Sequence, residues 1–256
     1  MKIAIIGYGK MGHMIEAIAL ERGHEIVGII DPTLVIGECP LVIDFDSEEF
    51  RSADVAIEFT TPATAKENIL RAWAQGVPVV SGSTGWKVEE CTILSPEGHD
   101  YLTESHFHNL ENFAKSSYEL KEEKGQKRVY IDGKLMLVWS SNFSVGVNIF
   151  FELNKELAGV MAKQPQYTPS IKEIHHIHKL DAPSGTAKTL KEAISHQLSA
   201  VSVPIESIRE GEVPGTHIVT WDSPEDTIVL THIAKGRRGF ALGAVIAAEE
   251  TAAQRH

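Results

Sequence analysis

The 256-residue sequence has few cysteines, no excess of positive charge and no long hydrophobic run. Its two cysteines, Cys39 and Cys91, cannot build a disulfide framework and form no C-x-x-C pair, which favours a reducing cytoplasm. No segment approaches the ~18 consecutive apolar residues that cross a bilayer, so we expect no membrane partner. The formal net charge of -11 argues against nucleic-acid binding, which needs positive surface to displace phosphate counterions. An anionic ligand would therefore need a locally basic site.

Short β-branched runs alternate with helical apolar spacing over the first 80 residues. Such alternation requires crossover connections and predicts a Rossmann-type, doubly wound parallel sheet of the α/β class. Thr61-Pro62 is expected to open a helix, with threonine as cap and proline in the first turn. The expected strands are 2–6, 25–30, 55–59 and 77–80, and the expected helices are 11–21 and 61–75.

The pattern changes after about residue 144, where consecutive strand-like runs are joined by short turns. This part is interpreted as an α+β domain with an open mixed or antiparallel sheet. The expected helices are 145–161, 185–198 and 241–253, and the expected strands are 171–178, 205–209, 216–221 and 227–233. Residues 87–134 are polar and hard to interpret. We expect a helix over about 101–120 and a peripheral excursion.

A glycine-rich motif, G-x-G-x-x-G, lies between the first predicted strand and the first predicted helix. Its first glycine permits a tight turn, its second lets the backbone approach a pyrophosphate, and its third allows close strand–helix packing. The helix N-terminus adds N–H groups and a positive dipole end. The motif predicts a dinucleotide site that comprises Gly7, Tyr8, Gly9, Lys10, Met11 and Gly12.

Asp31 ends the second predicted strand, at the interval of about 20 residues expected for a ribose-binding acid. Its carboxylate would accept hydrogen bonds from the adenosine ribose and repel a 2′-phosphate. The next residue is Pro32, so no adjacent cation offers a phosphate clamp. NADH is therefore the preferred cofactor and NADPH the alternative. A simple turn residue before proline is the competing interpretation of Asp31.

Basic side chains gather in the segment EIHHIHKLDAPSGTA, residues 173–187. In a strand, His176 and His178 would share one face while His175 points to the other. Three histidines suggest zinc, but the neighbouring Lys179 would repel a cation and no convincing fourth ligand is near, so no metal is predicted. A turn then enters a helix, whose N–H groups suit a carboxylate. This segment is the basic site that an acidic protein needs for an anionic substrate.

The segment closely resembles the signature of the 4-hydroxy-tetrahydrodipicolinate reductases (dihydrodipicolinate reductases). Five further matches follow in the family's order and cover most of the chain outside residues 87–134. They are GYGKMG at 7–12, EFTTP at 58–62, SGSTGW at 81–86, SSNFSVGVN at 140–148 and GFALGAV at 239–245. Relatives join the third and fourth motifs by a shorter connection, so residues 87–134 are interpreted as an insertion.

The resemblance implies an oxidoreductase of lysine and diaminopimelate biosynthesis that reduces a cyclic dicarboxylate to tetrahydrodipicolinate. It implies catalytic acid/base chemistry at His175 and proton donation by Lys179, and a homotetramer built through the second domain. Substrate carboxylate contacts are assigned to His176, Gly185 and Thr186. Cofactor contacts beyond residues 7–12 and Asp31 are assigned to Gly82, Ser83, Thr84, Ser140, Ser141, Asn142 and Phe143.

Two other functions stay open on the residues. Another two-domain amino-acid dehydrogenase would share the glycine-rich loop but has no reason to carry the histidine–lysine segment. A non-catalytic NAD(P)-sensing protein would be expected to have lost His175, His176 or Lys179, and all three are present.

The motifs also predict the division of the chain. Residues 1–144 are expected to form a dinucleotide-binding domain that the C-terminal helix within 239–256 completes. Residues 145–238 are expected to form a domain for substrate binding and oligomerisation.

Overall fold

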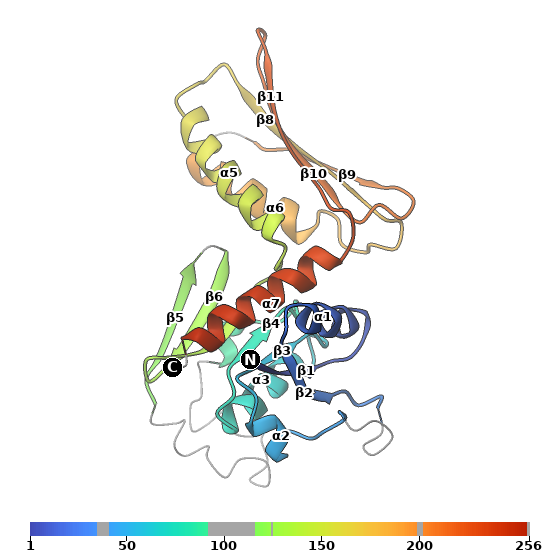
Figure 1. Cartoon of the computed structure of the whole chain (residues 1–256). Helices are drawn as coiled ribbons and strands as arrows, with labels where there is room; N and C mark the ends of the chain where they lie inside the picture. The colour runs from blue at the N-terminus through green and yellow to red at the C-terminus, as the bar shows by residue number, and fades with distance from the viewer. Residues whose placement is uncertain (35–40, 92–115, 124, 199–201, 255–256) are drawn as a thin grey trace. The chain divides into compact units, whose positions relative to one another are not determined.

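The computed structural model describes residues 1–34, 41–91, 116–123, 125–198 and 202–254. The chain forms two compact units (Figure 1): unit 1 is Met1–Phe143 with Phe240–His256, and unit 2 is Ser144–Gly239. These bounds lie one residue from the expected ones, while the roles expected for each part stay predictions. Among the described residues, no helix combines the length and apolar character that a membrane crossing demands.

Unit 1 is built on a seven-stranded sheet. Its strands are β1 (Lys2–Ile6), β2 (Glu25–Ile30), β3 (Val55–Glu58), β4 (Val79–Ser81), β5 (Tyr118–Glu123), β6 (Gln126–Ile131) and β7 (Lys134–Trp139). The strand order is β2-β1-β3-β4-β7-β6-β5. Strands β2, β1, β3, β4 and β7 run parallel to one another, whereas β6 and β5 are antiparallel to their neighbours. The α/β fold prediction is confirmed.

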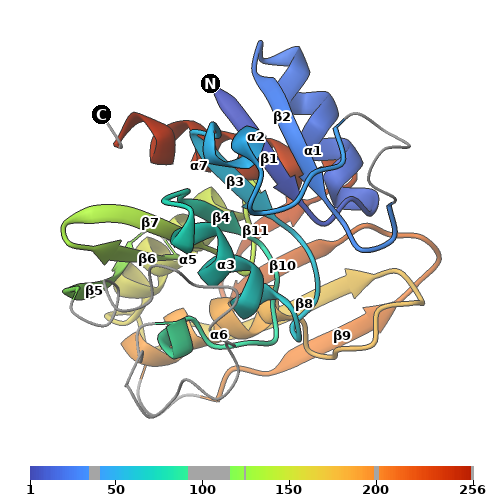
Figure 2. The same cartoon turned by 90° about the horizontal axis from the view of Figure 1, so that it is seen from below.

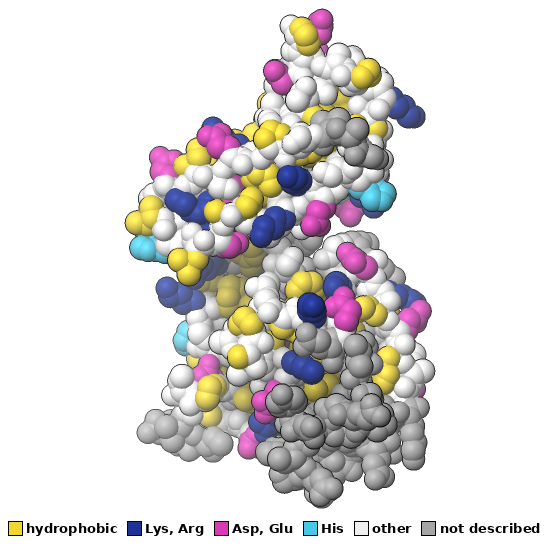
Figure 3. All heavy atoms as spheres, turned by 180° about the vertical axis from the view of Figure 1, so that it is seen from behind, with side chains coloured by type: hydrophobic (Ala, Val, Ile, Leu, Met, Phe, Trp, Pro, Cys, Tyr) yellow, Lys and Arg dark blue, Asp and Glu magenta, His cyan; other side chains and the backbone are white. Residues whose placement is uncertain are grey.

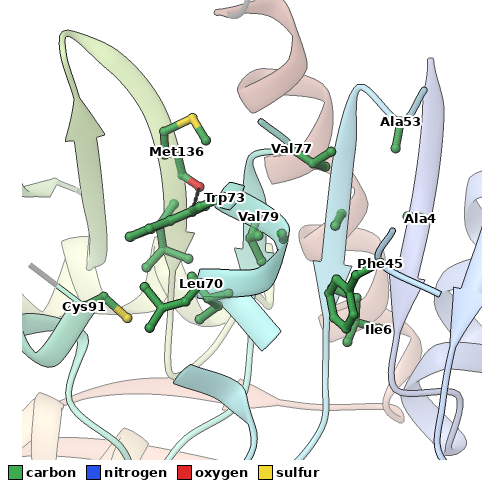
Figure 4. Packing of buried hydrophobic residues seen from close by; sticks show 14 of the residues in the cluster. Ala4, Ile6, Phe45, Ala53, Leu70, Trp73, Val77, Val79, Cys91 and Met136 are labelled. Atoms are coloured by element: carbon green, nitrogen blue, oxygen red, sulfur yellow. Dashed lines mark hydrogen bonds between the residues drawn. The ribbon is translucent and has the colours of Figure 1, made fainter. Parts of the chain in front are cut away.

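Helices cover both faces of this sheet (Figure 2). They are α1 (Lys10–Glu21), α2 (Glu48–Arg51), the 3-10 helix η1 (Val88–Cys91), α3 (Ala65–Ala74) and α7 (Arg238–Ala253). One core cluster packs α2 and α3 residues such as Phe50, Ile69 and Trp73 against the sheet, and the other packs α1 and α7. The buried Trp73 indole donates a 2.8 Å hydrogen bond to the Met136 carbonyl (Figure 4), so this large ring has a polar partner inside the core.

Unit 2 has a four-stranded sheet in the order β11-β10-β8-β9. Its elements are α5 (Val145–Met161), β8 (Thr168–His175), α6 (Gly185–Gln197), β9 (Ile205–Arg209), β10 (Thr216–Asp222) and β11 (Thr227–Ile233). β8 and β9 are parallel and the other pairs antiparallel, so the predicted mixed sheet is confirmed. A core that includes Phe150, Leu190 and Trp221 joins α5 and α6 to one face of the sheet.

The helix expected from Thr61 begins instead at Ala65, so the predicted start is wrong. Thr61 belongs to a turn in which its carbonyl accepts the backbone N–H groups of Thr64 and Ala65. Thr64 is the N-cap, but its hydroxyl bonds the hydroxyls of Thr60 and Thr61 rather than a helix amide. The polar threonines therefore use their side chains to form a loop ahead of the helix.

The strand expected to reach residue 178 ends at His175. The His175 carbonyl accepts the Glu210 N–H at 2.8 Å, and the chain then turns, with Lys179 N–H donating to the His176 carbonyl. The predicted sharing of one strand face by His176 and His178 is therefore wrong. His175 does lie in the strand and points to its buried face.

The interpretation of residues 87–134 as a peripheral excursion is wrong for β6. This strand pairs with β7 and places Val129 and Ile131 in the hydrophobic core of unit 1. The helix expected over 101–120 is wrong at residues 116–120, of which 118–120 belong to β5, and its part up to residue 115 lies outside the described residues. On β6, Arg128, Val129 and Ile131 are buried, and the register of its pairing with β7 shifts between Val129 and Tyr130.

Candidate active site

The glycine-rich loop joins β1 to α1 in a conformation that two of its glycines make possible. Gly7 has a φ of +90°, and a Cβ there would lie 2.3 Å from the Phe59 carbonyl oxygen. A Cβ on Gly12 would lie 2.4 Å from the Gly7 carbonyl oxygen. A Cβ on Gly9, the N-cap of α1, would meet nothing within 4 Å. The backbone at Gly9 is thus open to a ligand at a helix N-terminus, where a pyrophosphate is favoured.

Asp31 ties the end of β2 to this loop. Its carboxylate accepts the Tyr8 backbone N–H at 2.6 Å and both the N–H and the hydroxyl of Thr33. Partial burial raises the pKa of Asp31, but these hydrogen bonds outweigh it, so the pKa lies below its ordinary value. Asp31 is therefore an anion that shapes the loop. The Tyr8 hydroxyl, in turn, donates to Glu16.

A cavity of about 460 Å³ opens beside the loop. It brings together nine residues from three segments that follow β1, β3 and β4, which are Gly9, Lys10, Met11, Phe59, Thr60, Pro62, Gly82, Ser83 and Thr84. Six of these were predicted to contact the cofactor. The segment 59–62 was given no role, although it follows a parallel strand, and ligands of such sheets bind at the carboxyl ends of the strands.

Glu58 ends β3, directly before the cavity residues Phe59 and Thr60, and is fully buried. One carboxylate oxygen accepts the Thr60 N–H at 2.9 Å, the Thr60 hydroxyl at 2.5 Å and the Ser83 hydroxyl at 2.8 Å. The other oxygen accepts the Ser81 hydroxyl at 2.5 Å. Hydroxyls and one amide thus satisfy the carboxylate, and they connect the loop after β3 to the loop after β4.

The Ser83 carbonyl accepts the indole N–H groups of Trp86 and Trp139, each at 2.8 Å. Because the Ser83 hydroxyl also bonds Glu58, both the backbone and the side chain of this residue are fixed. The 82–84 loop is therefore preorganised.

The predicted contacts at 140–143 are placed differently from those of the 82–84 loop. Ser140 and Phe143 are buried, the former bonding the Asn142 carbonyl and the latter packing in the core with α7. Ser141 is exposed and Asn142 is half-buried. None of the four lines the cavity described above.

In unit 2, His175 belongs to a buried polar cluster at the end of β8. Its Nε2 lies 3.3 Å from Nε2 of His217 on β10 and 3.6 Å from a carboxylate oxygen of Glu173 on its own strand. The same His217 nitrogen lies 3.2 Å from the Ser184 hydroxyl. Gly215 leaves room for the ring, because a Cβ there would lie 3.0 Å from His175 Cε1.

Burial lowers the pKa values of both histidines, and neighbouring charges modify the two shifts to different extents. Burial lowers the pKa of His175 below its ordinary 6.5, while the charge of Glu173 opposes this shift. Burial, with a smaller contribution from His175, lowers the pKa of His217 to about 4. His217 is therefore uncharged near neutral pH.

Arg209 on β9 links Glu173 to the loop that follows β8. Its guanidinium donates to Glu173 at 3.2 Å and to the carbonyls of Lys179 and Asp181. The Lys179 ammonium lies 2.7 Å from the Asp181 carboxylate. Lys179 also acts on His175 through its charge, so the two residues predicted to be catalytic are near neighbours electrostatically.

The start of α6 presents the residues predicted to bind a carboxylate. Ser184 is the N-cap, and its hydroxyl accepts the Ala187 N–H. Gly185 is exposed, with nothing within 4 Å of the position of a Cβ, and Thr186 is half-buried. His176 is half-buried, while His178 is exposed beside Glu212. The predicted substrate contacts thus flank the turn that carries Lys179.

Glu173, His217 and Arg209 had no role in the sequence-based prediction. Glu173 is two residues before His175, so strand alternation places both on one face. His217 becomes its neighbour only through the pairing of β8 with β10, where Glu173 is opposite His217.

Glu173, His175 and His217 each offer an atom that could bind a metal ion, and these atoms lie within 4.8 Å of one another. The guanidinium of Arg209 already bonds Glu173, and Lys179 acts on both histidines through its charge. Two cations at the cluster disfavour a third.

Comparison with known proteins identifies the family. The family model for the N-terminus of dihydrodipicolinate reductase matches residues 1–99, and the one for the C-terminus matches residues 146–256. The chain belongs to this family. It is 40% identical over 260 residues to the 4-hydroxy-tetrahydrodipicolinate reductase of Christiangramia forsetii, covering 97% of this chain and 91% of that protein.

Other members support the same assignment. The 4-hydroxy-tetrahydrodipicolinate reductase of Lawsonia intracellularis is 30% identical, covering 97% of this chain and 93% of that protein. A dipicolinate-bound dihydrodipicolinate reductase from Paenisporosarcina sp. TG-14 superposes with a TM-score of 0.64 at 21% identity, covering 100% of this chain and 96% of that one. This last likeness shows the shared fold.

Proposed function

We propose that the chain is an NAD(P)H-dependent 4-hydroxy-tetrahydrodipicolinate reductase that acts in the cytoplasm. The observation that carries the proposal is the cluster in unit 2: in a member of this family, His175 is held by Glu173 and His217 beside Lys179 and the N-terminus of α6. This arrangement suits a substrate that carries carboxylates and accepts a proton.

The residues of unit 1 fit a dinucleotide. The open backbone at Gly9, the uncapped start of α1 and the cavity beside them form a cradle that a side chain at Gly9 would fill. When bound there, the reduced cofactor would supply a hydride. Glu58 and Asp31 hold the surrounding loops in place.

In unit 2 the division of labour follows from the geometry. Gly185 and Thr186 at the start of α6 would bind a substrate carboxylate, with His176 as a further contact. Lys179 would contribute positive charge and a proton, and His175 would act as the acid/base. The acidic chain thereby has the basic site that a dicarboxylate needs.

The proposal is tested by following NADH oxidation at 340 nm while aspartate semialdehyde, pyruvate and the preceding synthase generate the cyclic substrate in place. Turnover that requires the synthase supports the reductase. Oxidation or reduction with linear amino acids instead would favour another amino-acid dehydrogenase. Cofactor binding without turnover on either would favour an NAD(P)-sensing protein.

NADH is expected to bind at least as tightly as NADPH. Asp31 is anionic at the end of β2, so it disfavours a 2′-phosphate. Titration of both reduced cofactors by fluorescence or calorimetry measures the preference, and Asp31→Asn should shift the ratio of the two Kd values toward NADPH. A preference of the unmodified chain for NADPH of ~10-fold or more, equivalent to ~1.4 kcal/mol, contradicts this expectation.

We also propose a homotetramer built through the sheet of unit 2. Helices α5 and α6 cover one face of that sheet. Val229 and Ile233 of β11 belong to the other face and are 51% and 65% exposed. Hydrophobic side chains are visible over this unit in Figure 3. Because exposed apolar surface favours association, light scattering should give four times the 28.1 kDa chain mass, and Val229→Lys should lower it.

A further inference from the structure

The orientation of the His175 ring separates its two nitrogens. Nε2 faces inward, toward His217 and Glu173. In the described part of the chain, the buried side-chain atoms without a hydrogen-bond partner include Nδ1 of His176 and Nδ1 of His217 but neither nitrogen of His175. The hydrogen bond of the His175 ring in that part of the chain joins its Nε2 to His217 and leaves Nδ1 out. Nδ1 is therefore the nitrogen that is not fully buried, and the one that can exchange a proton with a ligand.

We propose that Glu173 and His217 are positioning residues: Glu173 supplies the counter-charge that lets the buried His175 carry a proton, and His217 accepts the inward Nε2–H so that the exchangeable proton is on Nδ1. This inference rests on the proposed function only for the identity of the proton acceptor. The charge relation and the ring orientation are properties of the chain itself.

The counter-charge is secured by the bonds that Glu173 receives. Burial would raise its pKa, but hydrogen bonds from Ser184, Ser207 and Arg209 lower it below the ordinary value, so the carboxylate stays ionised. Ser184 donates its backbone N–H to both carboxylate oxygens at 3.1 Å. A buried anion held this firmly attracts a proton to the imidazole beside it.

The remaining charges around His175 have opposing effects. Lys179 and Arg209 disfavour its protonation, whereas Glu173 and Asp181 favour it, with Glu173 contributing the most among these charges. His217 and, beyond it, His232 on β11 are held in the neutral state by burial. Removing the charge of Glu173 would therefore leave two cations facing His175 without a buried anion.

His217 contributes no charge but determines which nitrogen of His175 holds the exchangeable proton. At 3.3 Å its Nε2 lone pair can accept the Nε2–H of His175, which requires the His217 proton to be on Nδ1. Nδ1 of His217 is buried without a partner, so this unpaired donor is the cost of the arrangement. In the reaction, the His175 imidazolium would release its Nδ1 proton to the reduced substrate, keep Nε2–H, and regain a proton from water.

The test is a pH titration of the histidine rings of the full chain, labelled with 15N and followed by long-range 1H–15N NMR without substrate or cofactor. In Glu173→Gln the midpoint of His175 should fall by about 1 pH unit or more, the usual effect of an opposite charge within ~4–6 Å. The loss of kcat/KM as pH rises should move to lower pH by the same amount. Glu206→Gln on the other face of β9, where Glu206 pairs with Lys172, is the matched control and should change neither.

A second variant covers the case in which Glu173→Gln does not fold. Neutral His175 should show the proton on Nε2 in the unmodified chain and a mixture of both forms in His217→Leu, whereas His217→Gln, with a carbonyl acceptor, should restore Nε2–H. If the His175 midpoint moves by less than about 0.3 pH units in folded Glu173→Gln, Glu173 does not act as the counter-charge of His175. If neutral His175 of the unmodified chain carries its proton on Nδ1, the proposed role of His217 is wrong. If His175 titrates only after EDTA treatment, a metal ion occupies the cluster and both proposed roles are wrong.

Because the titration needs neither substrate nor turnover, it separates this inference from the proposed function. A chain without reductase activity that shows the expected His175 shifts would refute the function and keep the positioning roles. An active reductase in which Glu173→Gln leaves the His175 midpoint unchanged would support the function and refute the role of Glu173.

Discussion

Replacement of His175 by alanine is expected to lower kcat of the reductase by about 100-fold, the lower end of general acid–base effects. The reason is that the proposed acid/base group is then lost, while the start of α6, proposed to bind the substrate carboxylate, is kept. Affinity for NADH should be retained, since the glycine-rich loop and its cavity belong to unit 1. Steady-state kinetics together with a fluorescence titration of NADH separate the two effects.

Thr186→Val is the matched comparison, because it changes the same unit without removing a titratable group. It should raise KM for the cyclic substrate with a smaller change in kcat, which is the pattern of lost uniform binding. His175→Ala with near-normal turnover would contradict the catalytic assignment, even though membership in the family would stand. A variant that loses NADH affinity as well would indicate a general loss of structure, which circular dichroism would detect.

Local patterns were sufficient for most of the fold. The strands at 2–6, 25–30, 205–209 and 227–233 and the helix at 145–161 have the predicted bounds, because each combines a clear hydrophobic period with a turn or cap at its ends. The start of α3 was misplaced because three nearby threonines and Pro62 allow several caps, and side-chain bonds among the threonines decided between them.

The region after β4 shows what local patterns miss. β6 and β5 extend the parallel sheet as an antiparallel pair, and most of their residues other than Val129 and Ile131 are polar or charged. From its composition alone, a polar strand near the edge of a sheet cannot be distinguished from a surface segment. The hydrophobic contribution of β6 depends on its pairing with β7, which the sequence does not specify locally.

The candidate site was predictable only in part, for a related reason. The residues singled out from the sequence were those in compact motifs, such as Gly7–Gly12 and His175–Lys179. His217 and Arg209 meet Glu173 through the register of three different strands. Glu58 was visible in a motif, but its role depends on hydroxyls that follow two separate strands. Tertiary pairing created both buried carboxylate clusters.

Glu58→Gln is expected to weaken NADH binding by about 10-fold, or ~1.4 kcal/mol, with a smaller loss in thermal stability. Glutamine preserves the size of the buried side chain but replaces two oxygens that accept four hydrogen bonds by an amide that has one acceptor oxygen. The loops that carry Thr60 and Ser83 on the wall of the cavity would then be ordered only when the cofactor binds, which lowers its affinity.

Ser81→Ala is the control for the Glu58 variant, because it removes one bond to the oxygen that does not hold Thr60 or Ser83. Its NADH affinity should stay within about threefold of the unmodified chain, or ~0.7 kcal/mol, while its melting temperature falls. Fluorescence titration of NADH and thermal unfolding measure the two quantities for each variant. If Glu58→Gln lowers the melting temperature and leaves the Kd unchanged, Glu58 serves stability alone. If the Kd rises while the fold is intact, the buried Glu58 side chain sets the shape of the proposed cofactor cavity through residues that the cofactor itself would touch.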